Sequence, residues 1–347
     1  MAWQIPLYDV QQENQLVSAE LAQAFQRVLK SGRFVLGPEL AAFEAELARY
    51  VGTNEAVGVK SGTDALVLGL EALGIGPGDE VITTPFTFIA TVAAIVRVGA
   101  RPVLADIEPD TLCLALDACA RALTRRTKAV VLVHLFGHCA NIDQFGQFCQ
   151  QHNLVLVEDA AQAIGATWRG EKLGRFGAIA TFSFYPTKNL GALGNGGALV
   201  GQRLTRNCGP SARLDELQAA FLRIKLKRLD RELARRRELA RRYDSALSGI
   251  VRLVRGAEGC VANYHQYAIL TDQRDRLRRF LADQGVETAV YYPRPVYREP
   301  ALINWSRSLP GAEQACREVL CLPIRPSLTD QEQARIINAI QMFFGNG

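Results

Sequence analysis

The sequence lacks the features of a membrane or secreted protein. Across its 347 residues, no apolar run approaches the roughly 20 residues that a membrane-spanning helix needs. Residues 1–6 show no basic stretch followed by an apolar core, so no secretory signal peptide is recognisable there. We therefore expect a cytoplasmic protein with no membrane partner.

Metal-binding and disulfide patterns are also scarce. The eight cysteines include no pair at C-x-x-C spacing, and in a cytoplasmic protein we expect them to be reduced and partly buried. His134, His138 and Cys139 resemble a set of zinc ligands, but they lie around the end of a predicted strand, where the helical spacing of a zinc pair is not expected. We predict no metal site.

Positive charge is concentrated in one segment. The net charge is +5, and residues 223–242 hold many of the lysines and arginines. Apolar residues recur there at helical spacing, which predicts one long helix over residues 214–247 with its basic side chains on a solvated outer face. Aromatic interleaving and a helix-turn-helix pattern are both missing, so we expect no nucleic-acid partner.

Strand-like and helical stretches alternate between residues 55 and 200. Such alternation is typical of a mostly parallel sheet with helices on both faces, so the predicted fold class is α/β. The predicted strands are residues 56–59, 80–83, 102–107, 129–134, 155–158, 180–185 and 197–200.

After the long helix the pattern changes to that of a small α+β domain. It predicts a strand at residues 263–270, a helix at 274–284, a strand at 288–292 and a helix at 328–344. We therefore expect a large domain over residues 15–240 and a small C-terminal domain over 241–347. Residues 1–14 are expected to pack near the small domain.

The most informative residue is Lys188, which lies in the run Ser183-Phe184-Tyr185-Pro186-Thr187-Lys188-Asn189-Leu190-Gly191. It follows an apolar strand and precedes a glycine-rich loop. A lysine held against an apolar wall loses its proton more easily, and a neutral lysine is the nucleophile that makes a Schiff base with an aldehyde cofactor. Taken alone, a surface lysine after a turn proline is the more ordinary interpretation.

A carboxylate follows the strand at residues 155–158. In parallel sheets ligands bind beyond the carboxyl ends of strands, which is where Asp159 falls. A pyridoxal phosphate site needs an acid opposite the pyridine nitrogen, because a protonated nitrogen draws electrons out of the substrate carbanion. Gln162, three residues further on, is a candidate partner of the ring hydroxyl. The alternative is that Asp159 caps the segment that follows it.

A candidate phosphate cradle precedes the helix predicted at residues 65–73. Small residues at 61–63 would leave backbone N–H groups free at the positive end of the helix dipole, with the Thr63 hydroxyl as a further donor. Ser183 would add a second hydroxyl. The alternative is an ordinary helix cap at Ser61 or Thr63.

The motif at residues 85–91 contains two phenylalanines. An aromatic side chain there would stack on a flat ring, whereas Phe86 is the candidate for a position in the hydrophobic core.

Together these motifs resemble the DegT/DnrJ/EryC1/StrS sugar aminotransferases, which have the fold of aspartate aminotransferase (fold type I). Eleven matches occur in order along nearly the whole chain. They are Gly37-Pro38-Glu39 with Phe43-Glu44, Ser61-Gly62-Thr63-Asp64-Ala65-Leu66, Pro77-Gly78-Asp79-Glu80-Val81, Thr87-Phe88-Ile89-Ala90-Thr91, His134-Leu135-Phe136-Gly137, Glu158-Asp159-Ala160-Ala161-Gln162, the Lys188 run, Arg213-Leu214-Asp215-Glu216-Leu217-Gln218-Ala219-Ala220, His265-Gln266-Tyr267, Tyr292-Pro293 and Leu322-Pro323.

The resemblance implies a role for each matched residue around the cofactor, pyridoxal 5'-phosphate. Lys188 would bind it through a Schiff base and, once released, would move the proton. Asp159 would pair with the pyridine nitrogen and Gln162 with the ring oxygen, while Phe88 would stack on the ring.

The other implied roles concern phosphate, substrate and assembly. Gly62, Thr63 and Ser183 would hold the phosphate, and Tyr185 and Tyr292 would face the substrate. The resemblance also implies a homodimer with shared active sites.

Two departures from the family pattern stand out. Asn195 replaces an acidic residue in a glycine turn, which we expect to matter little. Between Arg206 and Arg213 the family has a longer loop, ending in an asparagine that reaches the neighbouring subunit's cofactor phosphate. This chain has Ser211 near that place. Either the loop is naturally short or some of its residues are absent from this sequence.

The expected reaction moves an amino group from an amino acid, glutamate by resemblance, to a nucleotide-linked keto-sugar. Residues 61–66 and 289–293 look more like those of members acting on 3-keto than on 4-keto sugars, and the nucleotide is dTDP or UDP. Related dehydratases carry histidine in place of the lysine, so Lys188 argues against that activity. The remaining alternative is a non-catalytic regulator that only binds the cofactor.

Overall fold

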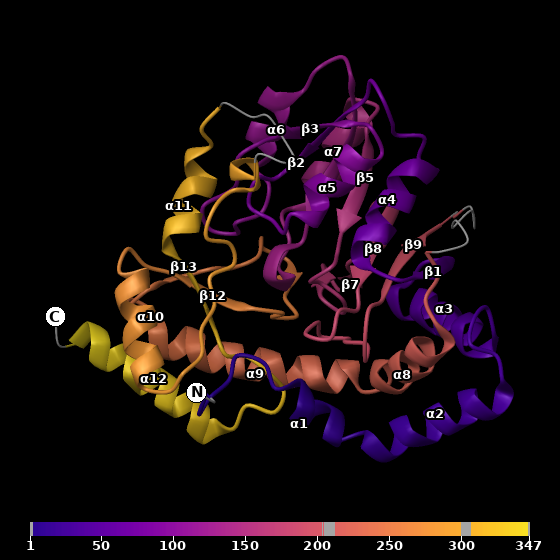
Figure 1. The fold of residues 1–347 in the computed structure, drawn as a ribbon. Coiled ribbons are helices and arrows are strands. Elements are labelled where there is room, and N and C mark those ends of the chain that lie inside the picture. The colour runs from indigo at the N-terminus through magenta and orange to yellow at the C-terminus, as the bar shows by residue number, and fades with distance from the viewer. Residues whose placement is uncertain (1–2, 203, 205–211, 300–306, 346–347) are drawn as a thin grey trace.

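The computed structural model describes residues 3–202, 204, 212–299 and 307–345. Figure 1 shows a larger α/β part built around the main sheet and a smaller C-terminal part, with α8 (Glu216–Leu226) and α9 (Leu229–Leu247) running end to end beneath them. Among the helices of the described residues, none combines the length and apolar character that a bilayer crossing requires.

A seven-stranded sheet forms the centre of the larger part. Its order is β1 (Glu55–Val59), β9 (Gly197–Gly201), β8 (Ile179–Ser183), β5 (Val155–Asp159), β4 (Thr127–Val133), β2 (Glu80–Thr83) and β3 (Arg101–Leu104). The strands from β8 to β3 are parallel, whereas β9 is antiparallel to both of its neighbours. The predicted mostly parallel sheet is confirmed, although β3 ends three residues earlier than expected.

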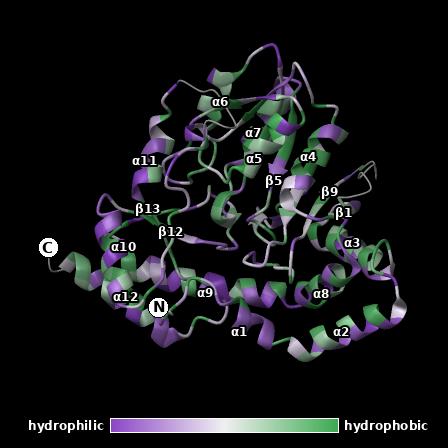
Figure 2. Cartoon of the chain, in the orientation of Figure 1, coloured by the Kyte–Doolittle hydropathy of each residue, from purple (hydrophilic) through white to green (hydrophobic). Residues whose placement is uncertain are grey.

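Helices bury both faces of this sheet, because successive residues of a strand point to opposite sides. Val57 and Val131 belong to the apolar cluster on one face, and their neighbours Ala56 and Val130 belong to the cluster on the other. Figure 2 shows the apolar residues gathered on these central elements. The first face is covered by α4 (Gly62–Ala72) and α5 (Ala90–Arg97), and the second by α3 (Pro38–Val51), α6 (Leu116–Ala122), α7 (Ile142–Gln151) and α8.

The C-terminal part is built on a three-stranded antiparallel sheet. Its apolar cluster includes Ile5, which also forms a bridge with Val286, so the chain before α1 (Val10–Gln15) lies against this part. The elements of this part are β10 (Arg252–Leu253), β12 (Tyr267–Leu270), β13 (Val319–Leu322), α10 (Arg274–Asp283), α11 (Pro310–Glu318) and α12 (Asp330–Gly345).

The remaining elements complete the described fold. They are α1 (Val10–Gln15), α2 (Ser18–Ser31), the 3-10 turns η1 (Leu135–Gly137) and η2 (Val296–Arg298), and a small sheet of β6 (Thr167–Trp168), β7 (Glu171–Lys172) and β11 (Cys260–Val261).

Two sequence-based expectations about the elements are wrong. The helix predicted over residues 214–247 is broken at Lys227 and Arg228, because α8 packs on α2 and α3 whereas α9 packs on α12. Residues 288–292 form no strand. Within this segment only Ala289 forms a β-bridge, with Cys321. The chain then turns away, so that the Tyr292 hydroxyl accepts a hydrogen bond from Gln162.

The basic side chains of α9 are not confined to a solvated face, which corrects a third expectation. Arg236 is 4% exposed and donates to the Tyr264 carbonyl at 3.2 Å. Arg237 donates to the carbonyls of Ala262 at 2.9 Å and Gly165 at 3.0 Å. These guanidinium groups therefore tie α9 to the loops beside the strand ends.

Candidate active site

Lys188 and Asp159 come together at the carboxyl ends of neighbouring parallel strands. Asp159 ends β5 and pairs in register with Thr181 of β8, the strand that leads into Lys188. Burial lowers the pKa of Lys188 to about 8, although the nearby Asp159 carboxylate acts in the opposite direction. More of this amine is therefore neutral near neutral pH than in an exposed lysine.

Asp159 is buried and held in one orientation. Its Oδ2 accepts a hydrogen bond from the Thr91 hydroxyl at 2.8 Å, and its Oδ1 accepts the Ala161 N–H at 3.2 Å. Burial raises the pKa of Asp159, while Thr91, Ala161 and Lys188 favour its charged form. A turn rather than a helix follows Asp159, so its bond to the Ala161 N–H caps a turn and not a helix.

Gln162 has a fixed amide on the same side of the sheet. Its Oε1 accepts the Phe136 N–H at 2.7 Å, and its Nε2 donates to the Tyr292 hydroxyl at 3.1 Å. An amide nitrogen carries two N–H donors, so Tyr292 takes only one of them. The other is available to a ligand.

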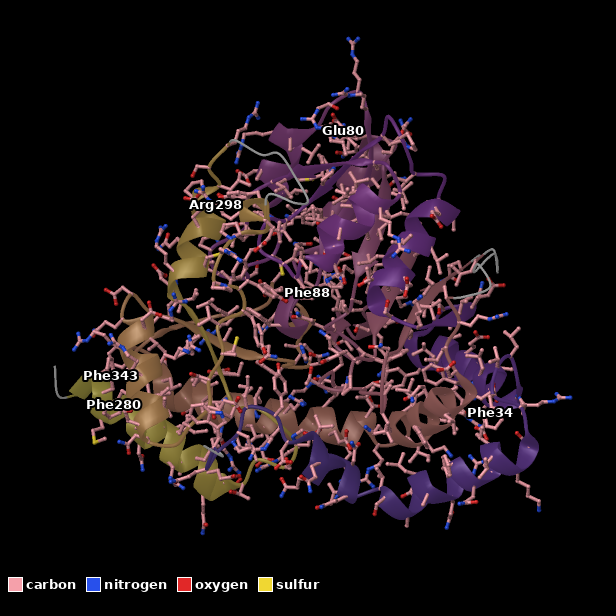
Figure 3. All side chains as sticks on the ribbon, in the orientation of Figure 1. Phe34, Glu80, Phe88, Phe280, Arg298 and Phe343 are labelled. Atoms are coloured by element: carbon pink, nitrogen blue, oxygen red, sulfur yellow. The ribbon has the colours of Figure 1, made fainter. Side chains whose placement is uncertain are left out.

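The two phenylalanines at residues 86 and 88 have different environments. Phe86 is fully buried and packs edge-on against Phe136 and Tyr292, which makes it a core residue as predicted. Phe88 is 56% exposed and lies 6.3 Å from the Tyr292 ring. Figure 3 shows Phe88 between the larger part and the C-terminal part, and the exposure of its ring allows contact with a ligand. Tyr185 is similarly exposed.

The start of α4 contains a helix cap and the residues of the candidate phosphate cradle. Ser61 is the cap, since its hydroxyl accepts the Asp64 N–H at 3.1 Å. The N–H groups of Gly62 and Thr63 lie in the first turn, where a helix supplies no acceptor of its own. A Cβ on Gly62 would lie 2.8 Å from the Ser183 Cβ, so glycine is what brings this turn against Ser183.

The three side chains that resembled zinc ligands have separate partners. His134 Nε2 pairs with the Glu158 carboxylate at 2.9 Å, and His138 packs edge-on against Tyr264. Cys139 is fully buried. Over the described ranges no group of three or more His, Cys, Asp or Glu side chains is arranged to hold a metal ion. The seven cysteines in these ranges are free, and Cys208 lies outside them.

Sequence reasoning assigned no role to Thr91 or Asn263. Thr91 belonged to a recognised motif, and its hydroxyl, 3.0 Å from that of Thr87, is now seen to bind Asp159. Asn263 carried no signal beyond its position just before the His265-Gln266-Tyr267 motif. The shortened loop with Arg206 and Ser211 lies outside the described residues.

Comparisons with known proteins identify the family of this chain. A model described as the DegT/DnrJ/EryC1/StrS aminotransferase family matches residues 15–205 and 200–341, so its two segments meet beside the shortened loop. The dTDP-3-amino-3,4,6-trideoxy-alpha-D-glucose transaminase of Streptomyces venezuelae is 42% identical over 97% of this chain and 95% of its own length. A pleiotropic regulatory protein of Geobacillus stearothermophilus is 37% identical over 98% of both chains.

Solved structures of aminotransferases have the same fold as this chain. The crystal structure of S. venezuelae DesV in complex with a ketimine intermediate has a TM-score of 0.95, with 41% identity over 99% of both chains. That of NtdA from Bacillus subtilis with bound cofactor PMP has a TM-score of 0.86, with 31% identity over 94% of this chain and 82% of the other. The chain therefore belongs to the DegT/DnrJ/EryC1/StrS aminotransferase family, which confirms the predicted aminotransferase with a pyridoxal 5'-phosphate cofactor.

Proposed function

We propose that this protein transfers an amino group from an amino acid, glutamate by family resemblance, to a nucleotide-linked 3-keto sugar. The observation that carries the proposal is Lys188, with its lowered pKa, facing buried Asp159 at adjacent strand ends. The S. venezuelae relative is named for a 3-amino sugar linked to dTDP, which supports the choice of sugar position.

The residues present fit pyridoxal phosphate. Gly62 and Thr63 offer free N–H groups at the positive end of α4, and Ser183 is in contact with that turn. Asp159 is a buried carboxyl group at the end of β5, suited to pair with a protonated ring nitrogen. Phe88 presents an exposed ring face. These residues would hold the phosphate, the nitrogen and the ring.

Each side chain has a task in the reaction. When bound, pyridoxal phosphate supplies an aldehyde and a ring that stabilises negative charge on the substrate carbon. Lys188 would act as a nucleophile because its amine is partly neutral, and after release it would take the proton from the amino-acid α-carbon and pass it to the former aldehyde carbon of the cofactor. Asp159 keeps its orientation through Thr91, and Gln162 keeps a donor free because Phe136 and Tyr292 fix its amide.

We also propose that two copies assemble with their active sites shared between them. Support comes from apolar side chains on the surface beside α3, where Phe34, Val35 and Leu36 are 46%, 49% and 63% exposed. Phe34 lies at the edge of the molecule in Figure 3. A group of this kind is typical of a protein–protein contact. The cytoplasmic location stays a prediction.

A panel of keto-sugars tests the proposed substrate. Enzyme preloaded with glutamate is mixed with dTDP- and UDP-linked 3-keto and 4-keto sugars, and the amino-sugar product is measured by mass spectrometry. We expect kcat/KM to favour a 3-keto sugar by at least about tenfold, since one misplaced polar group in a pocket has an effect of that size or more. Faster amination of a 4-keto sugar would contradict the assignment of the sugar position.

The pH dependence of cofactor loading tests the state of Lys188. Only the neutral amine reacts, so the rate at which the apoprotein bonds to pyridoxal phosphate is expected to rise about tenfold per pH unit below pH 8 and to level off above it. The physical cause is the pKa of about 8 that burial gives Lys188. Stopped-flow absorbance measures this rate. A rise that continues to pH 10 would indicate an ordinary exposed lysine instead.

A non-catalytic regulator is the second candidate, because one full-length relative is named as a regulatory protein. Adding glutamate to the cofactor-loaded protein separates the two functions. An aminotransferase changes the cofactor absorbance and releases a keto acid, whereas a regulator leaves the spectrum unchanged.

A further inference from the structure

Asn263 is a fully buried asparagine whose polar atoms reach several other segments. Its Nδ2 donates to the main-chain carbonyls of Gln162 at 3.0 Å and Ile164 at 2.9 Å. Its Oδ1 accepts the His265 N–H at 2.9 Å. Both donors of this amide are therefore used to hold the turn that carries Gln162, which follows β5.

The same residue is linked to the lysine loop. The main-chain carbonyl of Asn263 accepts a hydrogen bond from Asn189 Nδ2 at 3.2 Å, and Asn189 directly follows Lys188. Asn189 Oδ1 lies 3.3 Å from His265 Nδ1. Asn263, Asn189 and His265 thus form a closed group of hydrogen bonds beside the reactive amine.

There is little room for this group to shift. The main-chain N–H of Asn263 donates to the Gly137 carbonyl at 3.2 Å. A Cβ on Gly137, whose φ is +88°, would lie 1.7 Å from Asn263 Oδ1. The preceding residue, Phe136, is the one whose N–H fixes the Gln162 amide. Asn263 therefore contacts the segment that orients Gln162 as well as the turn that carries it.

The group also fixes the protonation of His265. Because Asn189 Nδ2 is used as a donor, its Oδ1 is an acceptor, so the His265 proton lies on Nδ1. Burial lowers the pKa of His265 well below its usual value, and positive charge on Lys188 and Arg236 acts in the same direction. The imidazole therefore stays neutral and adds no positive charge beside Lys188. Asp159 supplies the opposing negative charge.

We propose that Asn263 is a positioning residue for the aminotransferase reaction: acting through Asn189 and His265, it sets the place of Lys188 relative to Gln162. This inference rests on the function proposed above. Its consequence is that Asn263 influences the reaction without touching cofactor or substrate, because a shift of about 1 Å in a catalytic group reduces a rate by roughly a hundredfold.

Three serine variants test this proposal, each shortening an asparagine side chain. Asn263→Ser removes the side-chain bonds to the Gln162 and Ile164 carbonyls and to the His265 N–H but keeps the main-chain carbonyl that accepts from Asn189. Asn189→Ser removes the link to the lysine loop. Asn54→Ser is the matched control. Asn54 is exposed beside β1 and also donates to a main-chain carbonyl, that of Gln202 at 3.3 Å, but it is not part of the site. Each protein is loaded with pyridoxal phosphate before measurement.

The readouts are kcat, KM, the pH midpoint at which the bound cofactor changes absorbance, and the Tm. We expect Asn263→Ser to lower kcat roughly 10- to 100-fold with KM little changed, and to shift the pH midpoint. Asn189→Ser should change kcat and the midpoint in the same direction by less. The double variant should lower kcat by less than the product of the two single effects, because both changes act on one connected group of hydrogen bonds. Asn54→Ser should match the wild type.

The opposite pattern overturns the proposal. If Asn263→Ser lowers only the Tm and keeps the wild-type kcat and pH midpoint, Asn263 is merely structural. If Asn263→Ser does not fold, the proposal is tested on Asn189→Ser alone. A wild-type kcat and pH midpoint for Asn189→Ser would then overturn the proposal. Failure of the proposed function gives a different result, since the wild-type protein itself would then show neither the absorbance of lysine-bound cofactor nor transamination.

Discussion

Replacing Lys188 with alanine is expected to abolish transamination, because one amine both bonds to the cofactor and moves the proton. Loss of a residue with both tasks should reduce kcat on the order of 10⁶-fold, the effect seen when a catalytic nucleophile is removed. The absorbance of lysine-bound cofactor should disappear as well. Both are measured on Lys188→Ala incubated with pyridoxal phosphate, glutamate and the best keto-sugar of the panel.

The matched control for this variant is Lys227→Ala. Lys227 is exposed in the turn between α8 and α9, so its loss should leave kcat, the spectrum and the Tm at wild-type values. Activity of Lys188→Ala within about tenfold of the wild type would rule out the assigned role, because an acid–base group alone supplies more than that.

Asp159→Asn is expected to have the next largest effect. The substitution keeps the size of the side chain and one oxygen, which can accept from either Thr91 or Ala161, but it removes the negative charge that faces the site. Loss of one preorganised electrostatic group typically lowers kcat about 10²- to 10³-fold. We expect that decrease in steady-state assays, together with a lower pKa of Lys188, because Asp159 is the group that raises it.

The control for Asp159→Asn is Asp283→Asn at the exposed end of α10, which should behave as the wild type. An unchanged kcat for Asp159→Asn would show that no charge is needed opposite the cofactor ring. Lys188 would then have to act without that partner.

The sequence predicts the central sheet well because its strands are short apolar runs bounded by polar or glycine residues, and both faces are buried. It does not predict the break at Lys227 and Arg228, because the apolar stripe continues through both helices and the break depends on which elements each one packs against. Residues 288–292 have the composition of a strand, but the hydrogen bond between Tyr292 and Gln162 favours another path.

Part of the site is equally readable from the sequence. Lys188, Asp159 and Gln162 follow strand ends, and general rules place ligands there. For Ser61 to Thr63 the sequence left a choice between a cap and a phosphate cradle. The structure shows that Ser61 is a cap, and the phosphate cradle at Gly62 and Thr63 stays a prediction.

The hydrogen bonds that support these residues cannot be predicted from the sequence in this way. Asn263 binds the carbonyl of Gln162, which lies about a hundred residues earlier in the chain, and no local pattern encodes that contact. The proton position on His265 depends on Asn189 in the same way. Such contacts follow only from how the C-terminal segment returns to the strand ends.

The most direct test of the central claim is to locate the bond between cofactor and protein. The protein loaded with pyridoxal phosphate is reduced with borohydride, digested, and its peptides are sequenced by mass spectrometry. The account predicts the cofactor mass on Lys188 alone. Cofactor found on another lysine, or on no lysine, would contradict it.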